Sequence, residues 1–237
     1  MGIDQAGPAP RIAQGVAAMT RSGGEARRKG LLAEAIRLFG RRGYQGTSLE
    51  AVASAAGVRK QTLLYYFPTK GALLEACVVE TSKRVAEALF EALEAETSPS
   101  RKAETVIRTL FRLAREWPEF PRFVREASRM DPEVIERFAS ALEPLRLRAL
   151  AFLANGMEEG QIRKQDPALL LFSLYTAVVG SITEAGVLRA VVGEDRSRTA
   201  LHRREQEVLS FVRNALAPGA QERRLRRAGK TAGGVPA

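Results

Sequence analysis

The residues best suited to chemistry form a polar and basic cluster between positions 59 and 70. The cluster comprises Arg59, Lys60, Gln61, Thr62, Tyr65, Tyr66 and Lys70. Arginine and lysine can bind phosphates or guanine edges, and glutamine can pair with adenine. Threonine and tyrosine hydroxyls commonly contact phosphate oxygens. Together with Thr47 and Ser48 just upstream, these are the candidate DNA-binding residues.

The small and apolar residues around this cluster predict the element that positions it. Thr47 and Glu50 form a capping box, which predicts a helix start. Gly57 stands where a tight turn between two helices requires a positive φ. The apolar positions that would seat the second helix on the first are Val58, Leu63 and Tyr66. This pattern is typical of two helices that cross steeply, as in a helix-turn-helix, although an ordinary helical corner is the alternative.

Two segments of the chain resemble a known family. The segments RRKGLLAEAIRLFGRRGYQGTSLEAVASAAGV and TLLYYFPTKGALL are similar to the N-terminal domain of the TetR/AcrR family of transcriptional repressors. The resemblance implies an all-α fold, with an N-terminal three-helix DNA-binding domain and a C-terminal helical ligand-binding and dimerisation domain. Arg59, Gln61, Leu64 and Gly71 depart from the family pattern, so we expect an operator preference that differs from the best-known members.

The net charge of +10 is distributed unevenly. Residues 1–70 contain eleven Lys or Arg and four Asp or Glu, whereas residues 71–218 contain 21 and 22. Residues 219–237 contain five and one. A polyanionic partner explains an excess at the helix-turn-helix end and in a basic tail. Charge that serves only solubility would be spread evenly.

The sequence offers no basis for an enzyme, a metal site or a cofactor. Cys77 and His202 are the only residues of their kinds, and no glycine-rich phosphate loop or nucleophile beside a base is present. A single cysteine, expected to be buried, suits a reducing cytoplasm. No signal peptide is visible. The uncharged segment Ala168 to Thr183 is shorter than the roughly 20 residues that a bilayer span requires.

The remaining chain reads as helix almost throughout. We expect helices at about Thr69 to Glu96, Ser98 to Trp117, Glu119 to Met130, Asp131 to Glu159 with a break at Pro144, Asp166 to Val192, and Arg198 to Leu216. The expected domains are disordered tails at 1–24 and 219–237, a DNA-binding domain at 25–70 and a ligand-binding and dimerisation domain at 71–218.

The helix expected from Asp166 is apolar on more than one face, so several partners must cover it. A self-association seam with the final helix explains this, and the family resemblance also implies a homodimer. The candidate interface residues are Leu174, Val178, Ile182, Val208 and Val212. A central helix in a monomeric core is the alternative. In a dimer, two recognition helices about 34–36 Å apart would bind a palindromic operator.

Aromatic residues and methionines of the central helices are candidates for lining an apolar ligand cavity. The candidate ligand-binding residues are Phe111, Trp117, Phe123, Met130, Phe138, Phe172 and Tyr175. Ordinary core packing is the alternative for each of them. The predicted function is a cytoplasmic DNA-binding repressor released from its operator by a small hydrophobic effector. The alternative is an architectural DNA-binding protein with little sequence preference and no effector.

Overall fold

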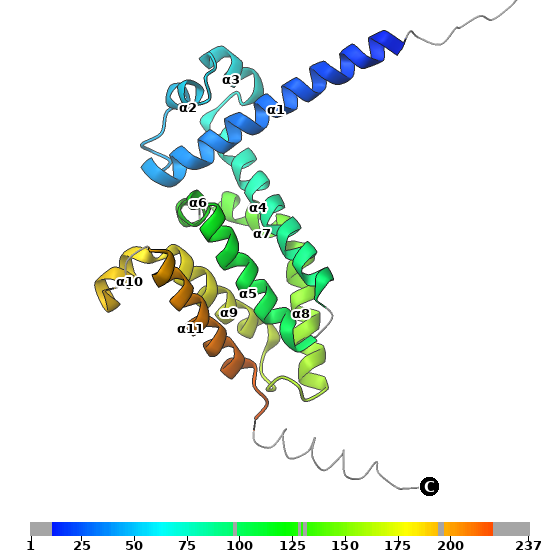
Figure 1. Ribbon diagram of the computed structural model, residues 1–237, viewed down its shortest axis with the longest axis vertical. Helices are drawn as coiled ribbons and strands as arrows, with labels where there is room; N and C mark the ends of the chain where they lie inside the picture. Colours follow the sequence, from blue (N-terminus) through cyan, green and yellow to red (C-terminus); the bar gives the residue numbers. More distant parts are fainter. Residues whose placement is uncertain (1–10, 97–98, 128, 130–131, 194–196, 220–237) are drawn as a thin grey trace, which may run out of the picture. The chain divides into compact units, whose positions relative to one another are not determined.

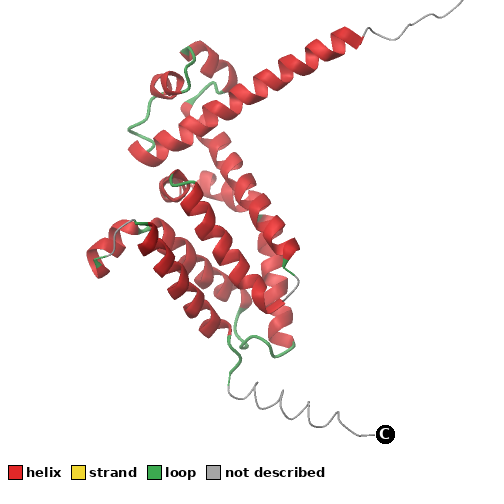
Figure 2. Ribbon diagram, in the orientation of Figure 1, coloured by secondary structure: helices red, strands yellow, loops and turns green. Residues whose placement is uncertain are grey.

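The computed structural model describes residues 11–96, 99–127, 129, 132–193 and 197–219. Every regular element in these residues is an α-helix, and this part of the chain contains no strand (Figure 2). The predicted all-α fold class is therefore confirmed. The helices group into two compact units, Met1–Cys77 and Val78–Ala237.

The first unit contains α1 (Arg11–Arg42), α2 (Leu49–Ala55), α3 (Lys60–Tyr66) and the first turns of α4 (Lys70–Ala95) (Figure 1). α2 packs against both α1 and α3. Buried apolar residues recur along α1 at the spacing of one helix face: Leu31, Leu32, Ala35, Ile36, Leu38 and Phe39. Val52 of α2 and Leu63 of α3 are fully buried in the same unit.

The boundary between the units lies after Cys77, whereas we expected it at residue 70. The first turns of α4 belong to the first unit, and Leu73, Leu74 and Cys77 are buried there. The Cys77 Sγ lies 3.9 Å from the carbonyl oxygen of Leu32 on α1. The prediction that this cysteine is buried is confirmed.

The disordered tail expected over residues 1–24 overlaps the first turns of α1, which begins at Arg11. Residues 1–10 and 220–237 lie outside the described residues. The alanines, Gln14 and Met19 in this stretch are good helix formers. They extend a helix that the buried stripe already nucleates, and extension costs much less than nucleation.

The α2–α3 turn is closed by backbone hydrogen bonds around a left-handed glycine. Gly57 has φ +66°, as predicted. Its N–H donates to the carbonyl of Ser54 at 3.1 Å, and the N–H of Val58 donates to Ala53 at 2.9 Å. This pair of bonds is the Schellman motif, which ends one helix and redirects the chain. The N-cap of α2 is Ser48, one residue later than the predicted capping box, and its Oγ accepts from the Ala51 N–H at 3.1 Å.

The second unit contains the rest of α4, then α5 (Pro99–Glu116), α6 (Glu119–Ala127), α7 (Pro132–Ala141), α8 (Glu143–Glu158), α9 (Pro167–Thr183), α10 (Ala185–Val192) and α11 (Arg198–Leu216). The predicted break near Pro144 separates α7 from α8, with the proline in the first turn of α8. The Asp166 side chain caps α9 by accepting from the N–H groups of Ala168 and Leu169. α5, α9 and α11 pack against one another (Figure 1).

The single helix expected from Asp166 to Val192 is wrong. The chain leaves helical geometry at Glu184, and α9 and α10 meet at a bend of 86°. Gly180 and Ser181 weaken the last turn of α9, since the Ser181 hydroxyl donates to the Val178 carbonyl at 2.7 Å. Among the described residues, no single helix is long and apolar enough to cross a membrane; α9 and α10 pass that test only when combined across their bend.

A buried carboxylate joins α5 to α11 in the second unit. Glu205 is 3% exposed, and its Oε2 accepts from the Arg115 Nη1 at 2.6 Å. Arg108 approaches the other oxygen at 3.6 Å. The neighbouring Arg204 donates to the Ser181 carbonyl on α9 at 2.8 Å. These charges are buried with partners in the contacts of α11 with α5 and α9.

Gly57→Ala should destabilise the helix-turn-helix by about 1–2 kcal/mol, because an L-residue is strained at this φ. A Cβ at Gly57 would meet no atom within 4 Å, so steric overlap adds nothing. Gly30→Ala is the matched control, because Gly30 lies within α1 and a Cβ there also meets no atom within 4 Å. Alanine at this helical position should stabilise the first unit by about 1 kcal/mol. Hydrogen exchange of α2 and α3 amides in the full chain measures both effects. Equal protection in the two variants would contradict the assigned role of the turn.

Candidate nucleic-acid interface and apolar surface

α3 presents a polar face that is free of the protein core. Arg59, Lys60 and Gln61 are exposed, and Tyr65 is 82% exposed although it is aromatic. Thr62 is half-buried. The Leu63 side chain, which is fully buried, anchors the opposite side of the helix. The short helix therefore displays base-reading and phosphate-binding groups while one apolar residue holds it in place.

Two of the predicted DNA-binding side chains are partly or fully covered by their own unit. Thr47 is 2% exposed, and its Oγ1 donates to the Gly43 carbonyl at 2.8 Å, so its hydroxyl is not available to a partner. Tyr66 is half-buried, and its hydroxyl lies beside Gly24 of α1, where an added Cβ would sit 3.5 Å from the hydroxyl oxygen. Both were selected for hydroxyl chemistry, but the sequence does not show which face a hydroxyl occupies.

The lysines of the candidate interface have neighbours that orient them. The Lys60 Nζ forms an ion pair with the Glu50 Oε1 of α2. The Lys70 Nζ lies 4.3 Å from the ring centroid of Tyr44, in cation–π geometry. Both lysines, with the exposed N-cap Ser48, line an open hollow of about 460 Å³ at the start of α2.

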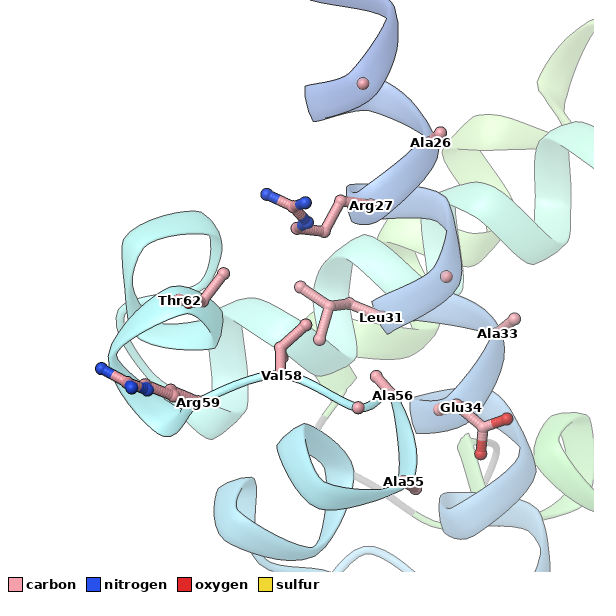
Figure 3. Close-up of a pocket in the computed structure, with 13 residues that line it drawn as sticks. Ala26, Arg27, Leu31, Ala33, Glu34, Ala55, Ala56, Val58, Arg59 and Thr62 are labelled. Carbon is pink, nitrogen blue, oxygen red and sulfur yellow. The ribbon is translucent and has the colours of Figure 1, made fainter.

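A second open hollow, of about 890 Å³, lies between α1, the α2–α3 turn and the start of α3. Figure 3 shows Arg27, Arg59 and Thr62 on one side of it, and Glu34 and Ala55 on the other. Neither Arg27 nor Arg59 forms an ion pair with a residue that the structure describes. Two unpaired guanidinium groups on one hollow can bind an anion such as a phosphate.

Sequence reasoning missed two residues of this surface, Arg27 and Glu50. Arg27 lies on α1, within the segment that resembles the family's DNA-binding domain, but the sequence analysis did not single it out. Glu50 was assigned to helix capping, and its contact with Lys60 spans ten positions across the turn. The excess positive charge of residues 1–70 was a signal for Arg27, but no pattern of residue spacing indicates the pair between Glu50 and Lys60.

The predicted ligand-binding residues are not brought together around one cavity. Phe111 is fully buried in a cluster with Ile107 and Leu209, whereas Trp117 stacks on Phe120 in another, with ring centroids 5.5 Å apart. Phe123 is buried as well. Phe172 and Tyr175 are 63% and 45% exposed, so they lie on the surface and not inside the unit. Met130 and the side chain of Phe138 lie outside the described residues.

The predicted dimer-interface residues mostly serve the core of the second unit. Val178, Ile182 and Val212 are buried in one cluster, and Leu174 and Val208 pack against it half-buried. The sequence pattern identified them as apolar positions, but in the structure they pack in the contacts among α5, α9 and α11. Most of the exposed large apolar side chains of the described chain lie instead on other faces of α9, α10 and α11: Leu169, Phe172, Tyr175, Val187, Val191, Val192 and Phe211.

No cluster of three or more His, Cys, Asp or Glu residues of the kind that binds a metal ion occurs in the described part of the chain. The single histidine, His202, is exposed, with its Nδ1 3.8 Å from the Glu205 Oε2.

Comparisons with known proteins agree with this architecture. The family described as "Bacterial regulatory proteins, tetR family" matches residues 31–77, which include α2, α3 and the start of α4. The HTH-type transcriptional regulator RutR of Escherichia coli K12 is 30% identical over 169 residues, covering 71% of this chain and 79% of RutR.

Two solved structures share the fold at low sequence identity. The transcriptional regulator FadR from Bacillus subtilis, solved in complex with stearoyl-CoA, has a TM-score of 0.67 and 17% identity, covering 79% of this chain and 98% of FadR. AibR, solved with isovaleryl coenzyme A and operator DNA, has a TM-score of 0.65 and 19% identity, covering 81% and 100%. The similarity to RutR across most of both chains, with the family match on the helix-turn-helix, shows that this chain belongs to the tetR family of bacterial transcriptional regulators.

Proposed function

We propose that this protein is a homodimeric, cytoplasmic repressor that binds a palindromic operator and is released by a small hydrophobic effector. It acts by binding and carries out no catalysis. The observation that carries the proposal is the exposed polar face of α3, which the Gly57 turn and the buried Leu63 hold clear of the core. Gln61 and Lys60 would contact base edges, and Arg59 would contact phosphate.

The DNA surface extends to α1 in this proposal. Arg27 and Arg59 flank one hollow and have no ion-pair partners among the described residues, which favours a shared phosphate contact. Lys70, held over the Tyr44 ring, would contact a further phosphate. AibR supports this picture as a protein of the same fold that was solved with operator DNA.

Base contacts and phosphate contacts should separate by mutation. Gln61→Ala should weaken operator binding about tenfold while leaving binding to unrelated duplex unchanged, because a base contact carries sequence information. Arg27→Gln and Arg59→Gln should weaken both, and each should reduce the slope of log affinity against log salt by about 0.9. The operator is first selected from random duplexes, and fluorescence anisotropy then measures both affinities.

Lys83→Gln, an exposed cation of the second unit, is the charge-matched control and should change neither affinity. If the wild type enriches no sequence but binds all duplexes with a steep salt dependence, the architectural alternative holds. The same loss of affinity in Gln61→Ala for operator and unrelated duplex would exclude base reading by α3.

Dimerisation is proposed to use the exposed apolar side chains of α9, α10 and α11. A surface with several uncovered large apolar residues on adjacent helices indicates an interaction site. A two-fold dimer would present two copies of α3 to successive major grooves of one DNA face. An effector would then act by binding one dimer arrangement more tightly than the other.

Phe172→Glu should convert the dimer to a monomer, because it places a charge on an exposed apolar surface without disturbing the core. Leu147→Glu is the matched control: Leu147 on α8 is 54% exposed, and its variant should remain dimeric. Analytical ultracentrifugation measures the assembly state, and circular dichroism checks that helix content is retained. A monomeric wild type, or a dimeric Phe172→Glu variant, would overturn the proposed interface.

The effector is proposed to be a coenzyme A thioester, whose acyl chain is apolar, or another molecule with an apolar chain, bound in the second unit. FadR and AibR, which share the fold, were solved with stearoyl-CoA and isovaleryl coenzyme A. Trp117 is the single tryptophan and stacks on Phe120 within the apolar cluster of α4, α5 and α6, so it reports on changes in that packing.

Stearoyl-CoA or isovaleryl-CoA should change Trp117 fluorescence and weaken operator binding at least tenfold, the scale of a typical allosteric coupling. Coenzyme A without an acyl chain is the control and should do neither, because it lacks the apolar group. Operator affinity that stays constant with both thioesters would reject this class of effector.

A further inference from the structure

An ion pair crosses the α2–α3 turn directly beside the candidate base-reading residues. Glu50 is the second residue of α2, and Lys60 is the first residue of α3. The Lys60 Nζ donates a hydrogen bond to the Glu50 Oε1. The Glu50 side chain is 59% exposed and the Lys60 side chain is 46% exposed. The pair therefore lies on the surface, and both charges can reach a partner.

The pairing itself adds little to stability, although Glu50 lies in the first turn of α2, where the helix dipole favours an acid. Exposed ion pairs contribute little to folding because water and salt screen them. Lys60 also occupies the first turn of α3, where the helix dipole disfavours a cation. The hydrogen bond from Lys60 lowers the pKa of Glu50 below its ordinary value, so the side chain is a carboxylate at neutral pH.

The carboxylate lies within an otherwise cationic hollow. Arg42, Lys60 and Lys70 line the hollow at the start of α2, and Glu50 is its one acidic residue. A phosphate placed there meets the repulsion of Glu50 and competes with it for Lys60. This penalty applies to every DNA sequence, because all duplexes present the same phosphates.

A base pair can satisfy both charges where phosphate cannot. In the major groove, cytosine presents the N4 amino donor, which a glutamate can accept, and guanine presents the O6 and N7 acceptors, to which a lysine can donate. A guanine–cytosine pair therefore offers partners for Glu50 and Lys60 together. Neighbouring side chains of opposite charge complement neighbouring donor and acceptor groups on one base-pair edge.

We propose that Glu50 is a specificity-determining residue: it weakens binding to phosphates in general and, together with Lys60, reads one guanine–cytosine pair of the operator. This inference rests on the proposed function as a sequence-specific regulator. In this proposal, Glu50 of α2 contacts a base pair alongside the residues of α3. Discrimination between DNA sequences then depends on the negative charge of Glu50.

Glu50→Gln tests the inference because it removes the charge and keeps the size of the side chain. Affinity for unrelated duplex should rise about threefold or more, and its salt dependence should steepen by about one phosphate contact as Lys60 is freed. Affinity for the selected operator should rise less or fall, so the ratio of operator to unrelated affinity should drop about tenfold. In a repeated selection, preference for one guanine–cytosine pair should be lost.

Glu25→Gln is the matched control, because Glu25 is an exposed acid of the same unit, paired with Lys29 at 3.9 Å. It removes the same charge and should leave the affinity ratio unchanged. Lys60→Met provides the second test: in that background, Glu50→Gln should no longer alter the preference at the guanine–cytosine pair, since the two residues act together.

The outcomes separate the two proposals. A wild type that enriches no operator overturns the regulator function and this inference with it. A wild type with a defined operator, whose affinity ratio and base preference survive Glu50→Gln, overturns this inference alone. If Glu50→Gln and Glu25→Gln change the affinity ratio equally, Glu50 acts only through its general negative charge, which contradicts this inference. If the effects of Glu50→Gln and Lys60→Met on base preference are additive, the two residues do not act together, which contradicts it as well.

Discussion

The candidate interface depends on the left-handed turn at Gly57. Two backbone hydrogen bonds close the C-terminus of α2 there, and the chain then enters α3 within three residues. Because α3 has only seven residues, its own hydrogen bonds could not stabilise it in water. The turn and the buried Leu63 hold it against α2. The turn and Leu63 therefore set the position of α3, and the ion pair with Glu50 further orients its Lys60.

The first unit carries unpaired arginines on one hollow and a single carboxylate, Glu50, within another that is otherwise cationic. In the proposed complex, the unpaired arginines on one hollow would supply sequence-independent affinity, and the Glu50 carboxylate beside Lys60 would oppose it. A DNA-binding protein must distinguish its operator from a large excess of other sequences, so the ratio of affinities matters more than affinity alone. Under the proposal, an acidic residue in a cationic surface raises this ratio by weakening complexes with DNA that offers it no donor group.

The second unit uses buried charge to define its packing. Glu205 and Arg204 sit in the contact between α11, α5 and α9, where apolar residues alone would tolerate other rotations of the helix. With that orientation fixed, the inward face of α9 closes the core around Val178 and Ile182. The remaining faces of α9, α10 and α11 keep their aromatic and branched residues exposed. The same helix thus serves the core on one side and supplies an apolar surface on another.

The sequence by itself determined the all-α class, most helix ends and the turn at Gly57, because caps, prolines and apolar spacing act over a few residues. It also identified Arg59, Lys60 and Gln61 as surface groups of the second helix. Only the tertiary structure decided that Thr47 is buried, that α9 ends at Glu184 and which aromatic residues are exposed. It alone brought Glu50 to Lys60. The physical reason is that burial and pairing depend on contacts between distant segments, which local patterns do not specify.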